Sequence, residues 1–517
     1  MSNPRKKLPI GIQTFREIRE ENYYYVDKTR LALNLVAEGK HYFLSRPRRF
    51  GKSLFLDTLK ELFEGNRVLF NGLAAEKQWD WSVKYPVVRF SFSGNQYSQA
   101  DQLEYDLTEQ LNELDNRYQH QPQNQTCPGR FRELIRHIQQ QAGQRVVVLV
   151  DEYDKPILDA LQAPEVARAN RDFLRSFYGS IKDYDAHIKF SFLTGVSKFS
   201  KVSIFPGLNN LYDFSLDPDY ATVCGYTDND LDTVFAAELE GLDREAIRKW
   251  YNGYNWLGDG VYNPFDVLQL FKRREFSNYW FETGTPTFLV DFLFKRQVPT
   301  LKLNHMISSA NMLSSFDIEK IETEALLFQT GYLTIKNSQR AGGQVFYTLG
   351  YPNQEVYQSL NENLLSALVN SPEQGQQSLQ LYQLLLANDF DGLKRLFHGF
   401  FASIPHQWYT NSKIQNYEGY YASVFYSYFA SLGLDVTVED ATNLGRIDMT
   451  LRFNEQIYIF EFKVVELAGE GNALRQIKAR GYAEKYRSEG KPIHLTGVEF
   501  SKDQRNIVAF EVESEMV

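Results

Sequence analysis

The feature of this sequence that most constrains its fold is a series of short apolar runs in the first 210 residues. Segments with helical patterns separate these runs, at 52–64, 98–117 and 129–142. Short apolar strands that alternate with helices predict a parallel, doubly wound α/β sheet. The runs, rich in β-branched and aromatic residues, are HYFLS (41–45), YPVVRFSF (85–92), RVVVLVD (145–151) and HIKFSFLTG (187–195).

The pattern changes twice further along the chain. From about residue 225 it is mostly helical, and near residue 410 a helix leads into several strands. A chain of 517 residues is too long for one ordinary core, so two or three domains are expected. We predict an α/β domain at 1–215, a mostly helical region at 216–390 and a second α/β domain at 391–517.

Composition limits the class of protein. A hydrophobic content of 43% with 15% aromatic residues supplies a core and argues against disorder. A net charge of -9 argues against an overall basic surface, so any contact with nucleic acid must come from a local patch. Cys127 and Cys224 lie far apart, which favours a reducing compartment. With no apolar run as long as a membrane span and no signal-peptide pattern, we expect a cytoplasmic protein without membrane segments.

The loop after the first run ends in Gly51, Lys52 and Ser53. These residues end the phosphate-binding pattern G-x-x-x-x-G-K-[ST], although Arg46 stands where the first glycine is expected. The tripeptide alone is a weak signal, because it also fits a helix start without a ligand. The strand before it and the helical segment after it provide the setting that a phosphate-binding loop requires.

Each residue type in this loop fits a nucleotide site. Gly51 allows the backbone to approach phosphate closely. Lys52 is predicted to reach the β- and γ-phosphates of ATP, and the Ser53 hydroxyl to ligate Mg²⁺. Arg49 and Phe50 complete the predicted nucleotide-binding loop, to which Arg49 adds positive charge.

A second pattern supports this interpretation. RVVVLVD is an apolar strand whose end places Asp151 beside Glu152. Apolar strands that end in acidic residues are common, but carboxyl ends of parallel strands meet at one edge of the sheet, where open α/β sheets bind ligands. Asp151 is predicted to hold Mg²⁺, and Glu152 to orient and deprotonate the attacking water.

Six segments together resemble the AAA-ATPase-like family of prokaryotic proteins with a C-terminal PD-(D/E)XK nuclease-like domain. That family tolerates Arg-Pro-Arg-Arg before Phe-Gly-Lys-Ser, so Arg46 departs from the general pattern and not from the family. The segments, in a resemblance that covers nearly the whole chain, are YYYVDKT, RPRRFGKSLFLDTL, VVLVDEYDKPI, FLTGVSKFSKVSIF, GLNNLYDFSL and YNPFDVL.

The resemblance implies further roles in the nucleotide site. Thr194, which closes the fourth run, is a candidate sensor of the γ-phosphate; the alternative is a buried strand threonine. Arg171 and Arg175 lie in the helical segment that follows the strand ending in Asp151, and they are candidates for an arginine finger. Ordinary surface salt bridges are the more usual role of such arginines.

The second chemical pattern lies in GRIDMTLRFNEQIYIFEFKV, residues 445–464. If Asn454-Glu455 is a two-residue hairpin turn, Asp448 lies directly opposite Glu461, and Lys463 falls on the same face. The three form the Asp…Glu-x-Lys constellation, in which two carboxylates bind Mg²⁺ or Mn²⁺ and Lys463 positions water or stabilises developing charge. A three-residue turn would break this arrangement, and a solvated hairpin face is the alternative.

Two more residues join this site through the PD-(D/E)XK pattern. Glu418 precedes an apolar helical stripe on the same helix face, and the pattern makes it an additional metal ligand. Gln476, in the helix after Glu-x-Lys, is similar to the glutamine that such nucleases use near the metal and the scissile phosphate. An exposed polar helix residue is the alternative for Gln476.

The segment at 475–491 is rich in basic residues, with Tyr482 and Tyr486 interleaved. Such a segment can follow a phosphate backbone, although an ordinary charged helix has the same composition.

Together the patterns predict an ATP-dependent nuclease. Nucleotide state in the N-terminal domain would gate a C-terminal domain that cleaves nucleic acid, with DNA favoured over RNA. ATP and Mg²⁺ (or Mn²⁺) are the predicted cofactors, and the sequence leaves homo-oligomerisation open. The alternative is a nucleotide-controlled switch whose C-terminal domain binds nucleic acid or protein without cleaving it.

Overall fold

The computed structural model describes residues 5–198, 210–284, 300–313, 321–369, 374–403 and 418–515, with a few single residues between 289 and 298. The chain divides into two compact units. The N-terminal unit comprises 1–284 and 305–353, and the C-terminal unit comprises 285–304 and 354–517. No helix among the described residues combines the length and the apolar character that crossing a membrane requires.

The N-terminal unit is built on a five-stranded sheet with the order β2-β3-β4-β1-β5, in which every pairing is parallel. All four apolar runs are confirmed as strands, and β3 is buried along its whole length. β-Branched side chains suit a strand that is covered on both faces. The strands are β1 (His41–Ser45), β2 (Val87–Ser91), β3 (Val146–Asp151), β4 (Ile188–Gly195) and β5 (Tyr212–Asp213).

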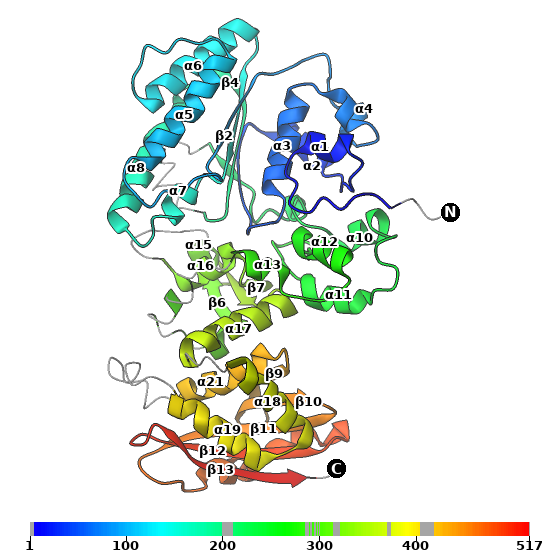
Figure 1. Ribbon diagram of the computed structural model, residues 1–517, viewed down its shortest axis with the longest axis vertical. Coiled ribbons are helices and arrows are strands. Elements are labelled where there is room, and N and C mark those ends of the chain that lie inside the picture. Colours follow the sequence, from blue (N-terminus) through cyan, green and yellow to red (C-terminus); the bar gives the residue numbers. More distant parts are fainter. Residues whose placement is uncertain are drawn as a thin grey trace. The chain divides into compact units, whose positions relative to one another are not determined.

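Helices cover both faces of this sheet, as the doubly wound prediction requires (Figure 1). One side carries α1 (Phe15–Glu20), α2 (Thr29–Glu38) and α3 (Lys52–Phe63). The other side carries α5 (Gln102–Arg117), α6 (Cys127–Ala142) and α8 (Pro164–Asp183). α3 begins directly after the phosphate-binding loop, so the loop lies at the carboxyl end of β1.

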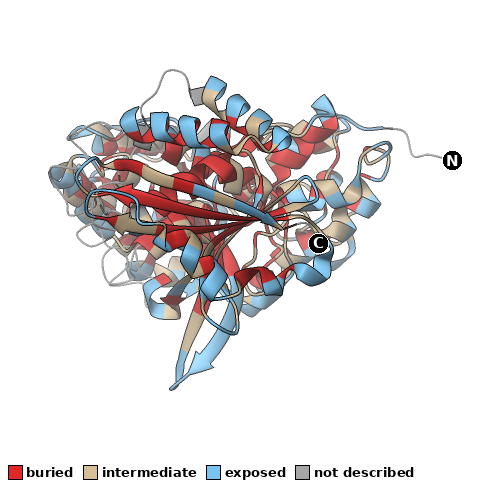
Figure 2. Ribbon diagram, turned by 90° about the horizontal axis from the view of Figure 1, so that it is seen from below, coloured by how far each residue is buried: buried red, intermediate tan, exposed pale blue. Residues whose placement is uncertain are grey.

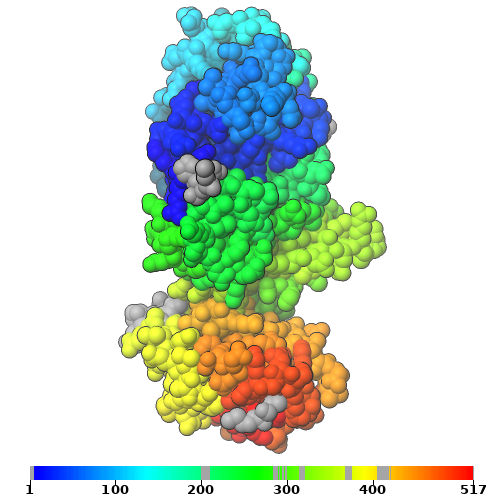
Figure 3. Space-filling view, turned by 90° about the vertical axis from the view of Figure 1, so that its right-hand side faces the viewer, coloured from blue at the N-terminus to red at the C-terminus, as the bar shows by residue number. Residues whose placement is uncertain are grey.

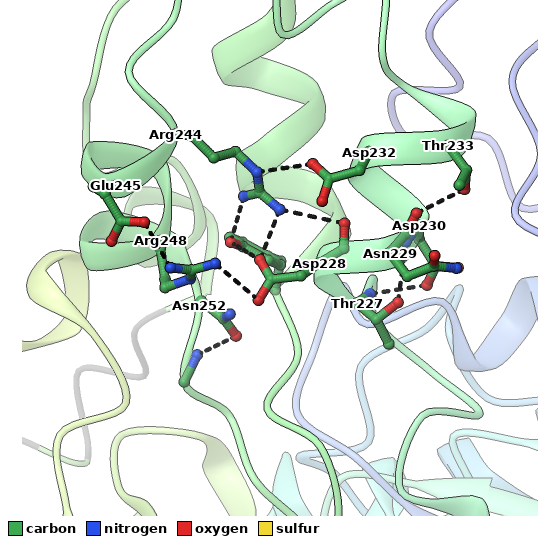
Figure 4. Close-up of polar contacts among 12 residues, drawn as sticks. Thr227, Asp228, Asn229, Asp230, Asp232, Thr233, Arg244, Glu245, Arg248 and Asn252 are labelled. Atoms are coloured by element: carbon green, nitrogen blue, oxygen red, sulfur yellow. Dashed lines mark hydrogen bonds and ion pairs between the residues drawn. The ribbon is translucent and has the colours of Figure 1, made fainter.

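A group of helices follows the sheet within the same unit. It contains α10 (Asp228–Val234), α11 (Arg244–Tyr251), α12 (Pro264–Arg273) and α13 (Tyr279–Gly284). A polar network joins α10 to α11 (Figure 4). The Arg244 guanidinium donates to Asp228 at 2.7 Å, to Asp232 at 3.1 Å and to the Tyr262 hydroxyl at 2.6 Å. Tyr262 immediately precedes the turn into α12, so the network also fixes the start of that helix.

The predicted helical middle also contains a three-stranded antiparallel sheet that the sequence analysis missed. Its order is β6 (Met306–Ser309), β8 (Gln344–Gly350), β7 (Thr334–Ala341). Most of β7 is exposed and polar, so it lacks the apolar alternation by which strands are recognised. The turn at Gly342-Gly343 has φ values of 56° and 82°, which two-residue hairpins favour. Figure 3 shows this hairpin projecting from the surface of the N-terminal unit.

The C-terminal unit contains a second five-stranded sheet, with the order β13-β12-β11-β10-β9. β11 and β12 are parallel, and the other pairs are antiparallel. Figure 2 shows the buried strands in red between helices that are exposed on their outer sides. The strands are β9 (Asp435–Ala441), β10 (Arg446–Phe453), β11 (Gln456–Val465), β12 (Ile493–Ser501) and β13 (Asn506–Glu515), of which the sequence analysis missed β13.

The two faces of this sheet have separate cores. On one face, α19 (Phe390–Ser403) and α21 (Glu418–Ser431) pack against Tyr458, Phe460 and Phe462. On the other face, α22 (Asn472–Ala479) packs against Ile457 and Ile459. Because side chains alternate along β11, Glu461 and Lys463 lie on the face that α22 covers. Two more helices, α17 (Gln354–Val369) and α18 (Gln374–Ala387), belong to this unit.

Candidate functional site

A cavity of 670 Å³ lies beside the phosphate-binding loop of the N-terminal unit. Three separate segments contribute to it: the loop at 48–54, the segment after β3 that holds Glu152, and the chain start at 9–13. The volume is in the range of small-molecule and cofactor sites. The remaining lining residues are Ser93, Gln96, Ser98, Lys155, Asp159, Tyr226, Pro264, Phe265 and Leu268.

The backbone of the loop has the shape that phosphate binding needs. Gly51 has a φ of 93° and directly precedes α3, and Arg49 has a φ of 67°. A side chain at Gly51 would be strained at this φ, which explains the glycine. Ser53 is in the first turn of the helix, where free backbone amides and the helix dipole attract anions.

Lys52 is buried and folded back over its own loop. Its Nζ donates to the carbonyls of Arg46 and Pro47, each at 2.9 Å. Burial lowers the pKa of Lys52, and the nearby carboxylates of Glu152 and Asp151 counteract that effect. The lysine is therefore a cation at the mouth of the loop whose partners are backbone carbonyls, which a phosphate can replace.

Arg46, at the position of the missing glycine, does not face the cavity. Its side chain is fully buried, and its guanidinium donates to the carbonyls of Ser45 at 2.9 Å and Ser215 at 2.7 Å. It also stacks on Trp256, 4.1 Å from the ring centre. The arginine thus attaches the entry turn of the loop to the segment after β5, so the turn is held by side-chain contacts instead of by a glycine.

Phe50 has a structural role in the same loop. Its side chain is 1% exposed and packs edge-on against Tyr254 and Trp256. Its carbonyl accepts a hydrogen bond from the amide of Gly225 at 3.2 Å. Of the two loop residues predicted beside Gly51, Phe50 therefore holds the loop against an aromatic cluster. The other, Arg49, is exposed.

The acidic pair after β3 has two different environments. Asp151 is 1% exposed, and its Oδ1 accepts no hydrogen bond from the described residues. Its Oδ2 lies 3.7 Å from the guanidinium of Arg89. Glu152 has a φ of 53° and lines the cavity with Lys52 and Ser53. Asp151 is not among the residues that line the cavity, but an unpartnered buried carboxylate oxygen is a ligand type that Mg²⁺ prefers, so its chemistry fits that ion.

The other predicted residues of this site do not line the cavity. Thr194 is fully buried, and its hydroxyl donates to the Leu44 carbonyl at 3.0 Å. Arg171 forms an ion pair with Asp172 on α8, and Arg175 is exposed on the same helix. Thr194 at the end of β4 has the contacts of a buried strand threonine.

In the C-terminal unit, the hairpin has the predicted register. The ladder runs from Phe453 opposite Gln456 to Met449 opposite Phe460, which makes Asp448 and Glu461 the next pair. Both turn residues, Asn454 and Glu455, have positive φ values of 50° and 58°. This is the two-residue turn on which the arrangement depended.

The three chemical groups are gathered at the end of this ladder. The Asp448 carboxylate accepts a hydrogen bond from the Phe462 amide at 2.8 Å. Lys463 Nζ lies 3.4 Å from Glu461 Oε1 and 3.7 Å from Glu418 Oε2. Glu461 is 1% exposed, and its Oε2 accepts no hydrogen bond from the described residues.

The pKa values of the two opposed acids reflect this setting. Burial, followed by repulsion from Asp448, raises the pKa of Glu461 to about 7. Burial also raises the pKa of Asp448. Carboxylates are forced to share protons when they are buried together, and a cation between them favours the charged forms. The orphaned Oε2 and the facing carboxylate therefore fit a divalent cation.

The structure brings Gln476 to this site and leaves Glu418 at its edge. Gln476 Nε2 donates to Glu461 Oε1. Glu418 begins α21, and its side chain is 48% exposed. Within the described residues, no group of three or more His, Cys, Asp or Glu side chains is placed to hold a metal. The pair Asp448 and Glu461, with Lys463, is the set that is assembled.

The rings of Tyr482 and Tyr486, interleaved in the basic segment, are buried and do not face a phosphate backbone. They are 2% and 1% exposed and belong to the core beneath α22. Their hydroxyls bond to the Arg446 carbonyl and to Asp440. α22 ends at Ala479, and two 3₁₀ turns follow. The sequence spacing of these two tyrosines is the same for a face packed into a core and for a face that contacts nucleic acid.

Sequence reasoning also missed residues in both sites. The chain start at 9–13 and Phe265 line the nucleotide cavity, but no spacing connects them to the loop. In the C-terminal unit, Glu499 is 1% exposed on β12 and accepts hydrogen bonds from several backbone amides before and at the start of α22. The signal that could have identified Glu499 is an acidic residue inside the apolar strand IHLTGVEF.

Comparison with known proteins agrees with both predicted domain types. A family described as "Predicted AAA-ATPase" matches residues 9–205, and the PD-(D/E)XK nuclease superfamily matches residues 416–510. The chain is 60% identical over 512 residues to "Uncharacterized protein in vnfD 5'region" of Azotobacter chroococcum mcd 1, a match that covers 99% of each chain. The chain therefore belongs to a family that joins a predicted AAA-ATPase domain to a C-terminal domain of the PD-(D/E)XK nuclease superfamily.

Proposed function

We propose that the N-terminal unit binds and hydrolyses ATP, and that its nucleotide state controls a metal-dependent nuclease in the C-terminal unit that cleaves DNA. The nucleotide part is supported by the loop geometry. Lys52 exchanges its two carbonyl partners for the β- and γ-phosphates, and the amides at the start of α3 bind the same oxygens. Ser53 and Asp151 are the proposed Mg²⁺ ligands.

Glu152 is the proposed general base. It lines the cavity beside Lys52, and its carboxylate can accept a proton from water next to the terminal phosphate. The cavity lining also includes the apolar side chains of Ile12, Phe265 and Leu268, which can contact a planar base. Arg48 and Arg49, both exposed at the rim, add charge that attracts a polyphosphate.

In the C-terminal unit, Asp448 and Glu461 are the proposed ligands of Mg²⁺ or Mn²⁺. A bound divalent cation would supply an activated water and stabilise charge on the scissile phosphate. Lys463 stabilises the same charge with its ammonium group, and Gln476 orients the Glu461 carboxylate. Glu418 is proposed as an outer acid that holds Lys463 in place.

One observation supports the nuclease most strongly. The two-residue turn sets the register that opposes Asp448 to Glu461, and one oxygen of the buried Glu461 has no hydrogen-bond partner among the described residues. A binding surface needs neither a buried acid opposite a second acid nor a lysine between two acids. Burying such groups without a function is costly.

The test is cleavage of plasmid, single-stranded DNA and RNA with Mg²⁺ or Mn²⁺ by purified protein. Asp448→Ala should lower the rate about a hundredfold or more, because one carboxylate holds a hard cation poorly. Lys463→Ala should lower the rate and leave metal affinity unchanged, since its charge acts on the transition state. Glu466→Ala, which removes an exposed acid paired with Lys502, is the matched control.

If the wild-type protein cuts no nucleic acid under any nucleotide and metal condition, the C-terminal domain binds without cleaving. If it cuts and Asp448→Ala cuts equally well, the active site is not on this hairpin.

A further inference from the structure

The helix that carries Gln476 rests directly on β12. Gly497 of β12 has no side chain at the contact point, and a Cβ there would lie 2.4 Å from the Leu474 amide nitrogen. Only glycine allows a backbone this close. The height of α22 above the sheet is therefore set by a backbone contact.

The N-terminal end of α22 is fixed by the carboxylate of Glu499, two residues after Gly497 on β12. Glu499 is 1% exposed, and its carboxylate accepts hydrogen bonds from four consecutive backbone amides. These are the amides of Glu470 at 2.5 Å, Gly471 at 3.1 Å, Asn472 at 2.5 Å and Ala473 at 3.1 Å. They include the free amides at the start of α22, where a negative charge is favourable.

We propose that Glu499 is a positioning residue for the nuclease site, acting through α22 and Gln476. This inference rests on the proposed nuclease function. Glu499 fixes the first turn of α22 on the sheet, Gln476 lies one turn further along that helix, and Gln476 donates to Glu461 Oε1. The same strand thus fixes both the height and the end of the helix that orients the Glu461 carboxylate.

Glu499 can be changed without removing the helix. Ile477 of α22 is buried in the apolar core that contains Ile459, and Leu474 packs against that core, so the helix keeps its main attachment. Glu499→Gln has nearly the same shape but places an NH₂ group against amides that are themselves donors. The first turn must then shift, and the hydrogen bond from Gln476 to Glu461 should be lost.

The experiment is a double-mutant cycle on the full-length protein with Glu499→Gln, Gln476→Ala and both together. Metal-dependent cleavage is measured for all four proteins. The matched control is Glu513→Gln, which removes an ion pair to the same helix, since Glu513 binds Lys478 at 2.7 Å on the exposed side. Exposed pairs of this kind contribute little.

Glu499→Gln alone should lower the cleavage rate about tenfold, as expected for a group that orients a ligand. In the Gln476→Ala background it should change the rate less than about twofold, because its target is already absent. Glu513→Gln should leave the rate unchanged. A tenfold loss in both backgrounds would mean that Glu499 acts through general stability, which overturns the proposal.

A second readout does not depend on cleavage. In protein labelled with ¹⁵N-glutamine, the side-chain NH₂ signal of Gln476 is assigned by its loss in Gln476→Ala. Glu499→Gln should move this signal to the position of a solvent-exposed glutamine, and an unmoved signal overturns the proposal. If the wild type cleaves nothing, the proposed function fails, and this signal alone decides whether Glu499 positions Gln476. If Glu499→Gln does not fold, Glu499→Asp, which keeps the charge on a shorter side chain, enters both measurements.

Discussion

Replacing Arg46 with glycine would restore the general phosphate-binding pattern, yet it should weaken the protein. The Arg46 side chain is buried outside the cavity, where it connects the entry turn of the loop to Ser215 and Trp256. Arg46→Gly removes these contacts and leaves buried carbonyls without a donor. The expected consequence is a less stable N-terminal unit and a loop that binds ATP no better than before.

The magnitude follows from the contacts of Arg46. Each of its two short hydrogen bonds, from a charged donor, contributes about 1.5–3 kcal/mol. The stack on Trp256 adds about 1–2 kcal/mol at a desolvated site. Against this, burial lowers the pKa of Arg46 to about 10, which corresponds to about 3 kcal/mol for holding the charge away from water. A net loss of about 3 kcal/mol remains in the free energy of unfolding.

Urea unfolding followed by tryptophan fluorescence measures this loss. Five of the six tryptophans lie in the N-terminal unit, at positions 79, 81, 250, 256 and 280. The control is Arg48→Ala, which removes an exposed arginine from the same loop and should change stability by less than about 0.5 kcal/mol. If Arg46→Gly unfolds at the wild-type urea concentration and binds ATP more tightly than the wild type, Arg46 does not hold the entry turn of the loop.

Three further predictions concern the N-terminal unit. Lys52→Ala should abolish tight ATP binding in calorimetry, and wild-type affinity in this variant would remove the basis for the loop assignment. Glu152→Gln should bind ATP normally and hydrolyse it at least about a hundredfold more slowly, measured as phosphate release. Burial raises the pKa of Asp154 to about 6, so the folded state binds the proton of this carboxyl group more tightly than the unfolded state does. Asp154 therefore contributes stability that is present below about pH 4 and is lost as the pH rises through 6. The free energy of unfolding of the wild type relative to Asp154→Asn should therefore fall by up to about 3 kcal/mol between pH 4 and pH 7, and a pH-independent difference would contradict the burial argument.

The sequence was sufficient to predict four of the five strands of the N-terminal sheet and the register of the C-terminal hairpin. β1 and β3 are buried on both faces, so their apolar runs end where the strands end. At Asn454-Glu455, a one-residue difference in the turn would have moved Glu461 to the other face. Pattern and geometry agree in these places because local sequence alone determines them.

Other features depend on contacts between distant segments, which a single sequence does not show. The role of Arg46 depends on Ser215, which lies 169 residues away. Tyr482 and Tyr486 lie in a basic segment, yet both rings are buried in the apolar core that contains Ile457 and Ile459. The backbone amides that donate hydrogen bonds to Glu499 belong to residues 26 to 29 positions before it. Composition therefore suggested a surface where tertiary packing produced a core.

Control of cleavage by the nucleotide state can be measured in the variant Glu152→Gln. In this protein ATP should bind and persist, so the ATP-bound state can be held while DNA cleavage is measured with Mn²⁺. We predict that the cleavage rate of Glu152→Gln differs at least about tenfold with and without ATP, and that Lys52→Ala shows no such difference. Equal cleavage by Glu152→Gln in both conditions, with ATP binding verified by calorimetry, would contradict the account.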